Sequence, residues 1–175
     1  MKHITRTLVC LTLAVCLLLP LTACGGGKWR NDLTAASLCN TVVEALPSAD
    51  GWRVVTDKYI SASSWGDDYA THMEKVSEYQ IMVSENSDMN INEVGVFRCA
   101  SEKDAKAVGE FVESYLETKK LQLTSLLESY NPAELPKLDT ATVNVMGCYV
   151  LYTILNSADT TTAGSTMEKA LTPTA

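Results

Sequence analysis

The segment from Glu93 to Tyr130 constrains the fold more than any other part of the chain. Residues 93–99 form a short apolar pattern typical of a strand, and a long amphipathic pattern typical of a helix follows directly. A helix of this kind must bury its apolar face against another element of the domain. We therefore expect the rest of the domain to pack against this strand and this helix.

The long helix has clear signals at both ends. Ser101 is a suitable N-cap, and two acids in the next three positions favour the positive end of the helix dipole. Asn131 and Pro132 end the pattern. Lys119 and Lys120 interrupt its apolar face. A helix of about 28 residues would measure roughly 42 Å, so we expect it to overhang a small sheet or to bend near the two lysines.

Weaker patterns supply the remaining elements. They predict a helix at about 32–46, strands at 79–84, 141–146 and 149–155, and a short last helix at 165–171. Residues 52–78 have no clear period, although 52–55 fit a short strand or an extended segment. The connection from 79–84 to 93–99 is too short for a parallel crossover. The order predicts an α+β fold, a two-layer sandwich in which a four-stranded, mostly antiparallel sheet carries the long helix on one face.

The amino terminus has the pattern of a secretory leader. Basic residues precede an apolar run over 8–19 that is too short for a permanent membrane span. Residues 21–24 then read Leu-Thr-Ala-Cys, which resembles the lipobox of bacterial lipoproteins. This resemblance implies cleavage between Ala23 and Cys24 and attachment of diacylglycerol to Cys24. The alternative is an ordinary leader cut elsewhere, with Cys24 as an incidental thiol.

The lipobox divides the chain into three expected parts. These are a signal peptide at 1–23, a flexible glycine-containing tether at 24–31, and a single domain at 32–172. The whole chain has 14 basic and 21 acidic residues, a net charge of −7. Loss of a leader that contains basic residues and no acids makes the domain more acidic. Because an acidic domain is repelled by anionic polymers, we expect a membrane anchor but no nucleic-acid partner.

The cysteines do not indicate a metal site or a disulfide framework. Of the six, two leave with the leader and one is the expected lipid site. The remaining three, Cys39, Cys99 and Cys148, have no C-x-x-C spacing. Cys99 and Cys148 lie at strand ends and can be near neighbours, so a disulfide between them is an open alternative. We favour small buried thiols at all three positions.

One family resemblance covers about residues 30–171. The lipobox leader, the strand at 93–97 that runs into the long helix, and the hairpin at 143–150 together resemble a lipoprotein family of Firmicutes called domain of unknown function 4358. The resemblance implies a Gram-positive envelope context, on the outer face of the cytoplasmic membrane. It implies no activity and no catalytic residues.

The residues that can support a chemistry do not form a recognised constellation. His72 is the only histidine after the leader, and no motif ties a serine or cysteine to it. Residues 88–93 begin like a calcium loop but have Glu93 where glycine is needed and Cys99 where the last acid is needed. Glu113 and Glu117 fall on the polar side of the long helix. We expect no catalytic residue, no metal and no cofactor.

Aromatic residues in the least regular part of the chain are the best candidates for a ligand groove. With aspartates among them, aromatic faces can bind a sugar or a peptide. Packing under an irregular segment is the plainer interpretation. The candidates are Trp52, Tyr59, Trp65 and Tyr69, accompanied by Tyr79 and by Asp57, Asp67 and Asp68.

The functional expectation is a lipid-anchored extracytoplasmic protein that acts as a non-enzymatic binding or accessory module of the cell envelope. Its ligand is not specified by the sequence, and a protein or a glycan of the envelope is the expected partner. The alternatives are a small envelope hydrolase, or the solute-binding component of a transporter.

Overall fold

The computed structural model describes residues 28–47, 51–55, 59–85 and 90–173. The predicted signal peptide, its cleavage site at Ala23/Cys24 and the lipid site Cys24 lie outside these residues. The described chain forms one antiparallel sheet in the order β1-β2-β3-β5-β4. Its strands are β1 (Trp52–Val54), β2 (Val76–Ser84), β3 (Glu93–Cys99), β4 (Thr142–Met146) and β5 (Tyr149–Ile154).

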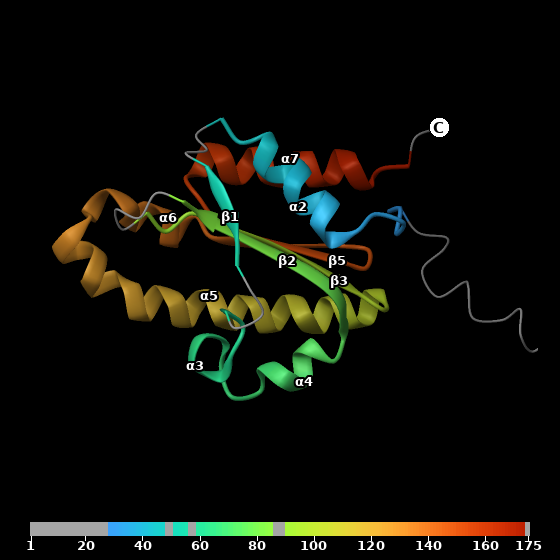
Figure 1. The fold of residues 1–175 in the computed structure, drawn as a ribbon, viewed down its shortest axis with the longest axis horizontal. Helices are drawn as coiled ribbons and strands as arrows, with labels where there is room; N and C mark the ends of the chain where they lie inside the picture. The colour runs from blue at the N-terminus through green and yellow to red at the C-terminus, as the bar shows by residue number, and fades with distance from the viewer. Residues whose placement is uncertain (1–27, 48–50, 56–58, 86–89, 174–175) are drawn as a thin grey trace, which may run out of the picture.

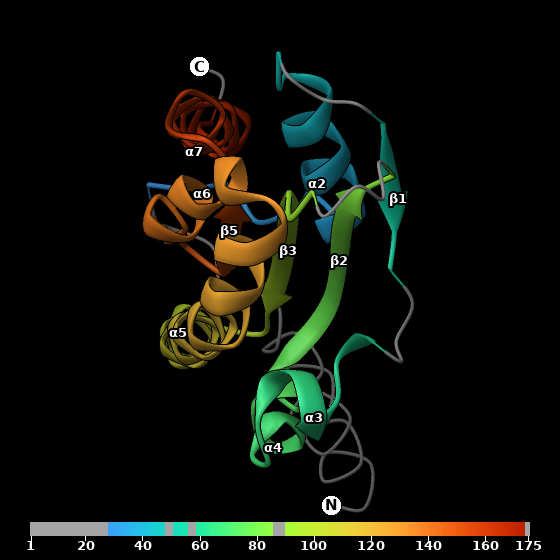
Figure 2. The same cartoon turned by 90° about the vertical axis from the view of Figure 1, so that its left-hand side faces the viewer.

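Helices cover both faces of this sheet (Figure 1). The helices are α2 (Ala35–Glu44), α3 (Ala62–Trp65), α4 (Tyr69–Met73), α5 (Glu102–Tyr130), the 3-10 turn η2 (Pro132–Glu134), α6 (Leu135–Asp139) and α7 (Ser157–Leu171). α5 packs on one face, with α3 and α4 beside it, and α2 and α7 pack on the other (Figure 2). None of the helices in the described part of the chain is long and apolar enough to cross a membrane.

The predicted α+β class and antiparallel pairing are confirmed, but two details of the predicted sandwich are wrong. The sheet has five strands rather than four, because Trp52–Val54 pairs with the end of β2. A three-residue strand is too short to show a period, so only its partner identifies it. The second error is the number of layers. A two-layer sandwich is predicted, but α2 and α7 contact each other on the sheet face opposite α5 and form a third layer.

The two covered faces explain why β3 and β5 are buried along almost their whole length. Along β3, Val94 and Val96 pack in the core under α2 and α7, whereas Phe97 packs in the core under α5. On β5, Tyr149 packs in the core under α2 and α7, and Tyr152 packs in the core under α5. Successive side chains of a strand point to opposite faces, so a central strand between two helical layers buries both.

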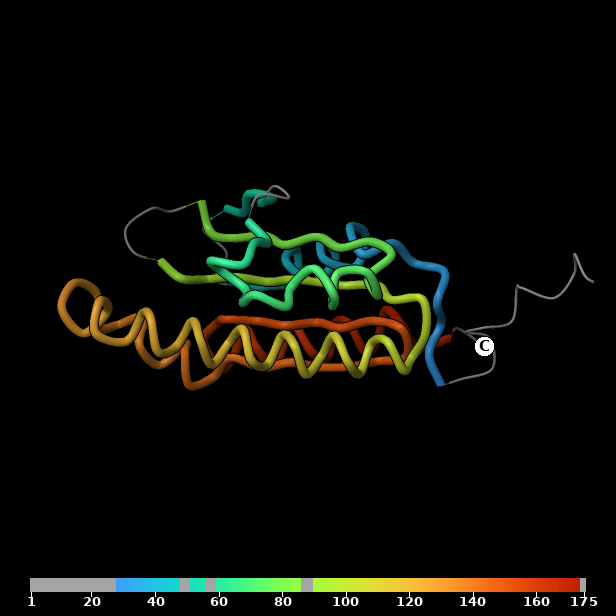
Figure 3. The backbone as a smooth tube through the Cα atoms, turned by 90° about the horizontal axis from the view of Figure 1, so that it is seen from below, coloured from blue at the N-terminus to red at the C-terminus, as the bar shows by residue number. Residues whose placement is uncertain are grey.

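The predicted long helix is confirmed at its start and in its length. The Ser101 hydroxyl accepts the backbone N–H of Asp104 at 3.1 Å and caps α5. The helix has 29 residues and continues unbroken through Lys119 and Lys120. Its last turns extend past the strands before the chain returns (Figure 3). The overhang leaves Tyr130 74% exposed.

The first and last helices differ from the predicted ones in their bounds. α2 begins at Ala35, capped by Thr34. Before it, the Arg30 N–H donates to the Leu171 carbonyl at 2.9 Å. α7 begins at Ser157 rather than near 165, because Asn156 accepts the N–H of Asp159 and caps it. A run of small polar residues conceals this helix in the sequence.

Two of the three cysteines follow the favoured interpretation, since Cys39 and Cys99 are buried and free. Cys148 is buried but disulfide-bonded, so the prediction of a free thiol is wrong at this position. Because Cys99 is free, the alternative disulfide between Cys99 and Cys148 is wrong as well. The two strand ends are nevertheless adjacent, with the Cys99 N–H donating to the Cys148 carbonyl at 2.8 Å. Burial raises the pKa of both Cys39 and Cys99 to about 12.

Candidate functional site

A buried carboxylate stands at the first residue of β3. Glu93 is 1% exposed, and its side chain lies on the α5 face of the sheet. Three tyrosine hydroxyls donate to it: Tyr115 and Tyr152 to Oε1 at 2.7 and 2.6 Å, and Tyr59 to Oε2 at 2.8 Å. These tyrosines come from α5, from β5 and from the segment before α3. One carboxylate therefore joins four separate parts of the fold.

Lys119 of α5 completes this cluster. Its Nζ forms an ion pair with Glu93 Oε2 and also donates to the hydroxyls of Tyr115 at 2.8 Å and Tyr59 at 3.0 Å. The side chain of Lys119 is 17% exposed, whereas the next lysine, Lys120, points outward to Asp139 with 51% exposure. The two lysines that interrupt the apolar face in the sequence thus have different environments, and only Lys119 is buried.

Hydrogen bonds saturate both charged groups of the cluster. A carboxylate offers about four lone-pair sites and an ammonium three protons. Glu93 receives three tyrosines and Lys119, and Lys119 gives its protons to Glu93 and two tyrosines. Neither group has a site left for a proton exchanged with a bound molecule. We conclude that the cluster stabilises the fold by joining its elements. It offers no free acid or base.

The protonation states agree with this view. Burial lowers the pKa of Lys119, but the negative charge of Glu93 and the hydrogen bonds outweigh it and leave that pKa raised. Burial, reinforced by the charge of Glu93, raises the pKa values of Tyr115 and Tyr152. The stable arrangement is an ion pair surrounded by neutral hydroxyls.

Two close contacts fix the tyrosines. The ring of Tyr152 crosses β3 directly over Gly95, its partner in the strand register. A Cβ at Gly95 would lie 2.0 Å from Tyr152 Cε1, so only glycine allows the hydroxyl to reach Glu93. Trp65 stacks on Tyr115 with 3.7 Å between ring centroids and 2° between planes.

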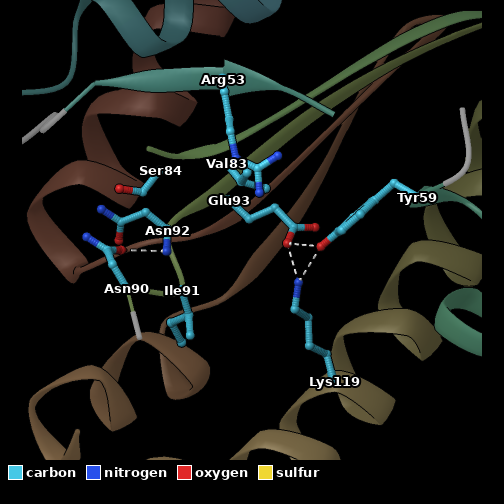
Figure 4. A pocket seen from close by; sticks show the side chains of 9 residues that line it. All are labelled: Arg53, Tyr59, Val83, Ser84, Asn90, Ile91, Asn92, Glu93 and Lys119. Carbon is cyan, nitrogen blue, oxygen red and sulfur yellow. Dashed lines mark hydrogen bonds and ion pairs between the residues drawn. The ribbon is translucent and has the colours of Figure 1, made fainter. Parts of the chain in front are cut away.

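A pocket of about 360 Å³ opens beside the cluster (Figure 4). Tyr59, Glu93 and Lys119 lie together at one side of it, and the Arg53 side chain of β1 extends toward Val83 and Glu93, its neighbours in the strand register (Figure 4). Its volume lies at the small end of the range for ligand sites in proteins. The remaining lining residues are Val83, Ser84, Asn90, Ile91 and Asn92.

Two polar groups of the pocket have no partner within the described chain. The guanidinium of the exposed Arg53 forms no hydrogen bond or ion pair with any described residue, although its backbone pairs with Val83 in the sheet. Asn92 is 7% exposed, yet its Oδ1 is buried without a hydrogen-bond partner among those residues. The Arg53 guanidinium is therefore available to a bound molecule. Asn92 Oδ1 is not, because it is buried, and alternation along the strand places it on the side of the sheet that α2 and α7 cover.

The predicted aromatic groove is not formed as one surface. Trp52 packs in the core under α2 and α7, whereas Trp65 is buried on the α5 side, where Tyr59 and Tyr69 also pack. Of the four, only Tyr59 lines the pocket beside Glu93. Tyr79 stacks on Phe97, with 5.7 Å between ring centroids, in the α5-side core. Asp57 lies outside the described residues.

The other residues considered for chemistry are accounted for by local contacts. His72 stacks on Phe111 at 4.4 Å between ring centroids, and its Nε2 lies 3.2 Å from Asp68 Oδ2. Glu113 and Glu117 are exposed, as their position on the polar face predicts. No group of three or more His, Cys, Asp or Glu within the described ranges could hold a metal ion.

The sequence contained two signals for the cluster that we did not combine. Glu93 is an acid at the start of a strand that is otherwise buried, and Lys119 is a base within the apolar face of a helix. Each is unfavourable in a core unless it is paired. Their opposite charges on two adjacent core elements were the available clue.

Comparison with known proteins identifies one family. Residues 66–155 match the model of the family described as Domain of unknown function (DUF4358). The match begins at Gly66 and ends at Leu155, so it includes Glu93, Lys119 and Tyr152 but leaves out Arg53 and Tyr59. No curated protein and no solved structure matches the chain.

Proposed function

The chain belongs to the DUF4358 family, whose description names no activity, and we propose that it is a lipid-anchored binding module of the cell envelope. It holds a small polar ligand in the pocket beside Glu93 and Lys119 and performs no chemistry on it. Its place is the outer face of the cytoplasmic membrane, with diacylglycerol on Cys24.

The single observation that carries the proposal is the contrast between the two kinds of polar group in the pocket. Glu93 and Lys119, which could exchange protons, are saturated by hydrogen bonds within the protein. The Arg53 guanidinium, which can bind but cannot exchange a proton at neutral pH, is without a partner among the described residues. A pocket of this composition favours recognition over catalysis.

The positions of the pocket and of Trp29, near the first described residue, support a definite orientation of the domain relative to the membrane. The pocket lies at the Glu93 end of β3, whereas Trp29 packs beside Gly147, in the hairpin turn next to the Cys99 end. Seven strand residues separate these ends by about 20 Å. A lipid on Cys24, close in sequence to Trp29, would hold the Cys99 end near the membrane and direct the pocket away from it.

The anchor is tested by metabolic labelling with an alkyne fatty acid. Wild-type protein should incorporate the label and lose its first 23 residues, and Cys24→Ser should remain unlabelled and retain them. Cys39→Ala is the matched control, because Cys39 is a buried free thiol of the domain and its loss should leave labelling intact. A labelled Cys24→Ser variant would remove this part of the proposal.

Ligand binding is tested by thermal shift with a library of small polar compounds. A ligand present at 100 times its Kd stabilises the folded state by about 2.7 kcal/mol, which for a domain of this size raises Tm by roughly 5–10 °C. Val83 lines the pocket, and Val83→Phe should fill it and abolish the shift. The proposal fails if no compound shifts the wild-type protein, or if Val83→Phe responds equally to every hit.

A further inference from the structure

The two edges of the sheet are protected unequally. An exposed edge strand presents unpaired N–H and C=O groups, and proteins usually protect such edges with short strands, charges, prolines or bulges. β1 forms one edge with only three residues and carries the charge of Arg53, and the register of the neighbouring β2 shifts between Val76 and Glu78. β4 forms the other edge. Its five residues, Thr142–Met146, include no charge and no proline and pair with β5 in a continuous register.

The backbone groups of Val143 and Val145 in β4 point away from the sheet. The Cys99 N–H donates to the Cys148 carbonyl at 2.8 Å, so the backbone groups of Cys148 are directed toward β3. This direction alternates along an antiparallel strand, so Val150 also points to β3 and not to its register partner Val145. The N–H and C=O of Val145, and by the same alternation those of Val143, therefore face outward. No described strand pairs with them, because β4 is the last strand of the sheet.

The side chains of the same two valines form an apolar surface that is only partly covered. A Cβ built on Gly109 of α5 would lie 2.7 Å from Val145 Cγ2 and 3.9 Å from Val143 Cγ1, so α5 passes over β4 at Gly109. Val145 is nevertheless 40% exposed. All six residues of the neighbouring strand β5 are buried, whereas none of the five residues of β4 is. The edge therefore has both apolar surface and backbone groups left to pair.

The charges of α5 beside this edge are arranged about the same point. Glu113 lines a cavity of about 290 Å³ together with Val143, which places it on the β4 side of the helix. Lys106 is exposed and precedes Glu113 by seven residues, or about two turns, so it lies on the same side. Gly109 lies between them in the helix and packs on β4. A positive and a negative side chain thus lie on either side of the level at which α5 crosses β4.

We infer that β4 is a self-association edge, which pairs antiparallel with β4 of a second copy of this chain about a two-fold axis at Asn144. In this register, Val143 of each copy exchanges two hydrogen bonds with Val145 of the other, so the outward groups of both valines are paired. The valines of the two copies then lie side by side on the α5 face, and such β-branched pairs stabilise a sheet. The inference goes beyond the proposed binding function and does not depend on the pocket.

Charge favours a second copy over an unrelated extended segment. A two-fold axis makes an interface self-complementary, because each contact occurs twice. An axis at the level of Gly109 places the half of α5 before this residue beside the half after it in the other copy. Lys106 of each copy then faces Glu113 of the other. An unrelated strand could pair with the backbone of β4, but it would not bring opposite charges to both of these side chains.

The test is disulfide trapping of the full chain in a non-ionic detergent, read by non-reducing electrophoresis after the thiols are blocked. The two copies of Asn144 form a non-hydrogen-bonded pair with about 4.5 Å between Cα atoms, a separation that a disulfide spans. Asn144→Cys should therefore yield a covalent dimer. Thr142→Cys is the matched control on the same strand, because its two copies would lie about 14 Å apart, which is too far to bridge. Cys39 and Cys99 are buried, so the wild type should yield no dimer.

Substitutions in the Asn144→Cys background test the edge and the charges separately. Val145→Lys puts two like charges beside the axis and should slow trapping about tenfold or more. Val54→Lys makes the same change at an exposed valine of the opposite edge strand and should leave the rate unchanged. Lys106→Glu should slow trapping, and adding Glu113→Lys should restore it, because the exchanged charges again meet opposite partners. This restoration would not occur if Lys106→Glu acted by destabilising the fold.

Each remaining outcome also decides the question. Absence of trapping at Asn144→Cys, or equal trapping at Thr142→Cys, would overturn the inference, because chance collisions in a micelle do not distinguish the two positions. Trapping at Thr142→Cys alone would show another register and refute the axis at Asn144. Equal rates for Val145→Lys and Val54→Lys would exclude the β4 edge as the contact. A Lys106→Glu variant that traps at the unchanged rate would refute the argument for a two-fold partner.

Discussion

The ion pair between Glu93 and Lys119 makes a quantitative prediction about stability. Removing one partner of a buried ion pair typically costs 3–5 kcal/mol, because the other charge is left in a low-dielectric interior. The Glu93 side chain is 2% exposed and that of Lys119 is 17% exposed. After Lys119→Met, Glu93 would keep three tyrosine donors. The lower end of the range, about 3 kcal/mol, is therefore expected.

A double-mutant cycle isolates the interaction of the two charges. Glu93→Gln keeps the shape of the side chain but leaves Lys119 uncompensated, so it should also cost about 3 kcal/mol. The double variant has neither charge, and its amide can still accept hydroxyl hydrogen bonds. Its loss should be close to that of either single variant, which corresponds to a coupling energy of about 3 kcal/mol.

Lys120 provides the matched control for this cycle. It follows Lys119 on the same helix and forms a 2.6 Å ion pair with Asp139. Both side chains of this pair are more than half exposed. Lys120→Met should therefore cost less than about 1 kcal/mol. Comparing the stability losses of Lys119→Met and Lys120→Met shows whether the cost comes from the burial of the ion pair or from the loss of any ion pair.

The assay is equilibrium unfolding in urea at pH 7, followed by tryptophan fluorescence. Trp65 stacks on Tyr115 inside the cluster and reports its integrity. With urea slopes of about 1–3 kcal/mol per molar, Lys119→Met should lower the midpoint by about 1–3 M. Equal losses for Lys119→Met and Lys120→Met, or additive losses in the cycle, would refute the view that the cluster is a buried brace.

Four further predictions concern the cluster and other parts of the fold. The raised pKa values of Lys119, Tyr115 and Tyr152 contribute stability that is complete below about pH 10, where the unfolded groups titrate. The urea midpoint should fall as the pH rises above that value, and a midpoint that rises there would contradict the assignment. Gly95→Ala should cost about 3 kcal/mol or more, because the new Cβ meets the Tyr152 ring. Gly164→Ala in α7, where nothing lies within 4 Å, should instead stabilise by about 0.5–1 kcal/mol in the same urea assay. Glu134→Gln weakens the bond to the Ile91 N–H and should speed hydrogen exchange at Ile91 and Asn92. Cys99, at the far end of β3, should exchange as before, and a uniform change along the strand would point to general destabilisation instead.

Local patterns determined the parts of the fold whose signals lie within one element. The strand at 93–99 and the helix after Ser101 were predictable because alternation, helical spacing and a cap depend on near neighbours in the chain. The same reasoning left residues 52–55 undecided between a strand and an extended segment, and it missed the true start of α7. A strand of three residues is defined by pairing with β2, and a helix of small polar residues is defined by its cap and by packing against α2.

The candidate site depended almost entirely on tertiary structure. Glu93, Lys119 and Tyr152 are widely separated in the chain, and their meeting requires the register that places Gly95 opposite Tyr152. The unpaired guanidinium of the pocket, that of Arg53, could not be identified from the sequence for the same reason. Residue types alone determined the acidic balance, the expected anchor at Cys24 and the central strand and helix. Only packing decided which charges are satisfied inside the protein and which remain for a ligand, because satisfaction of a polar group depends on distances between segments that sequence spacing does not specify.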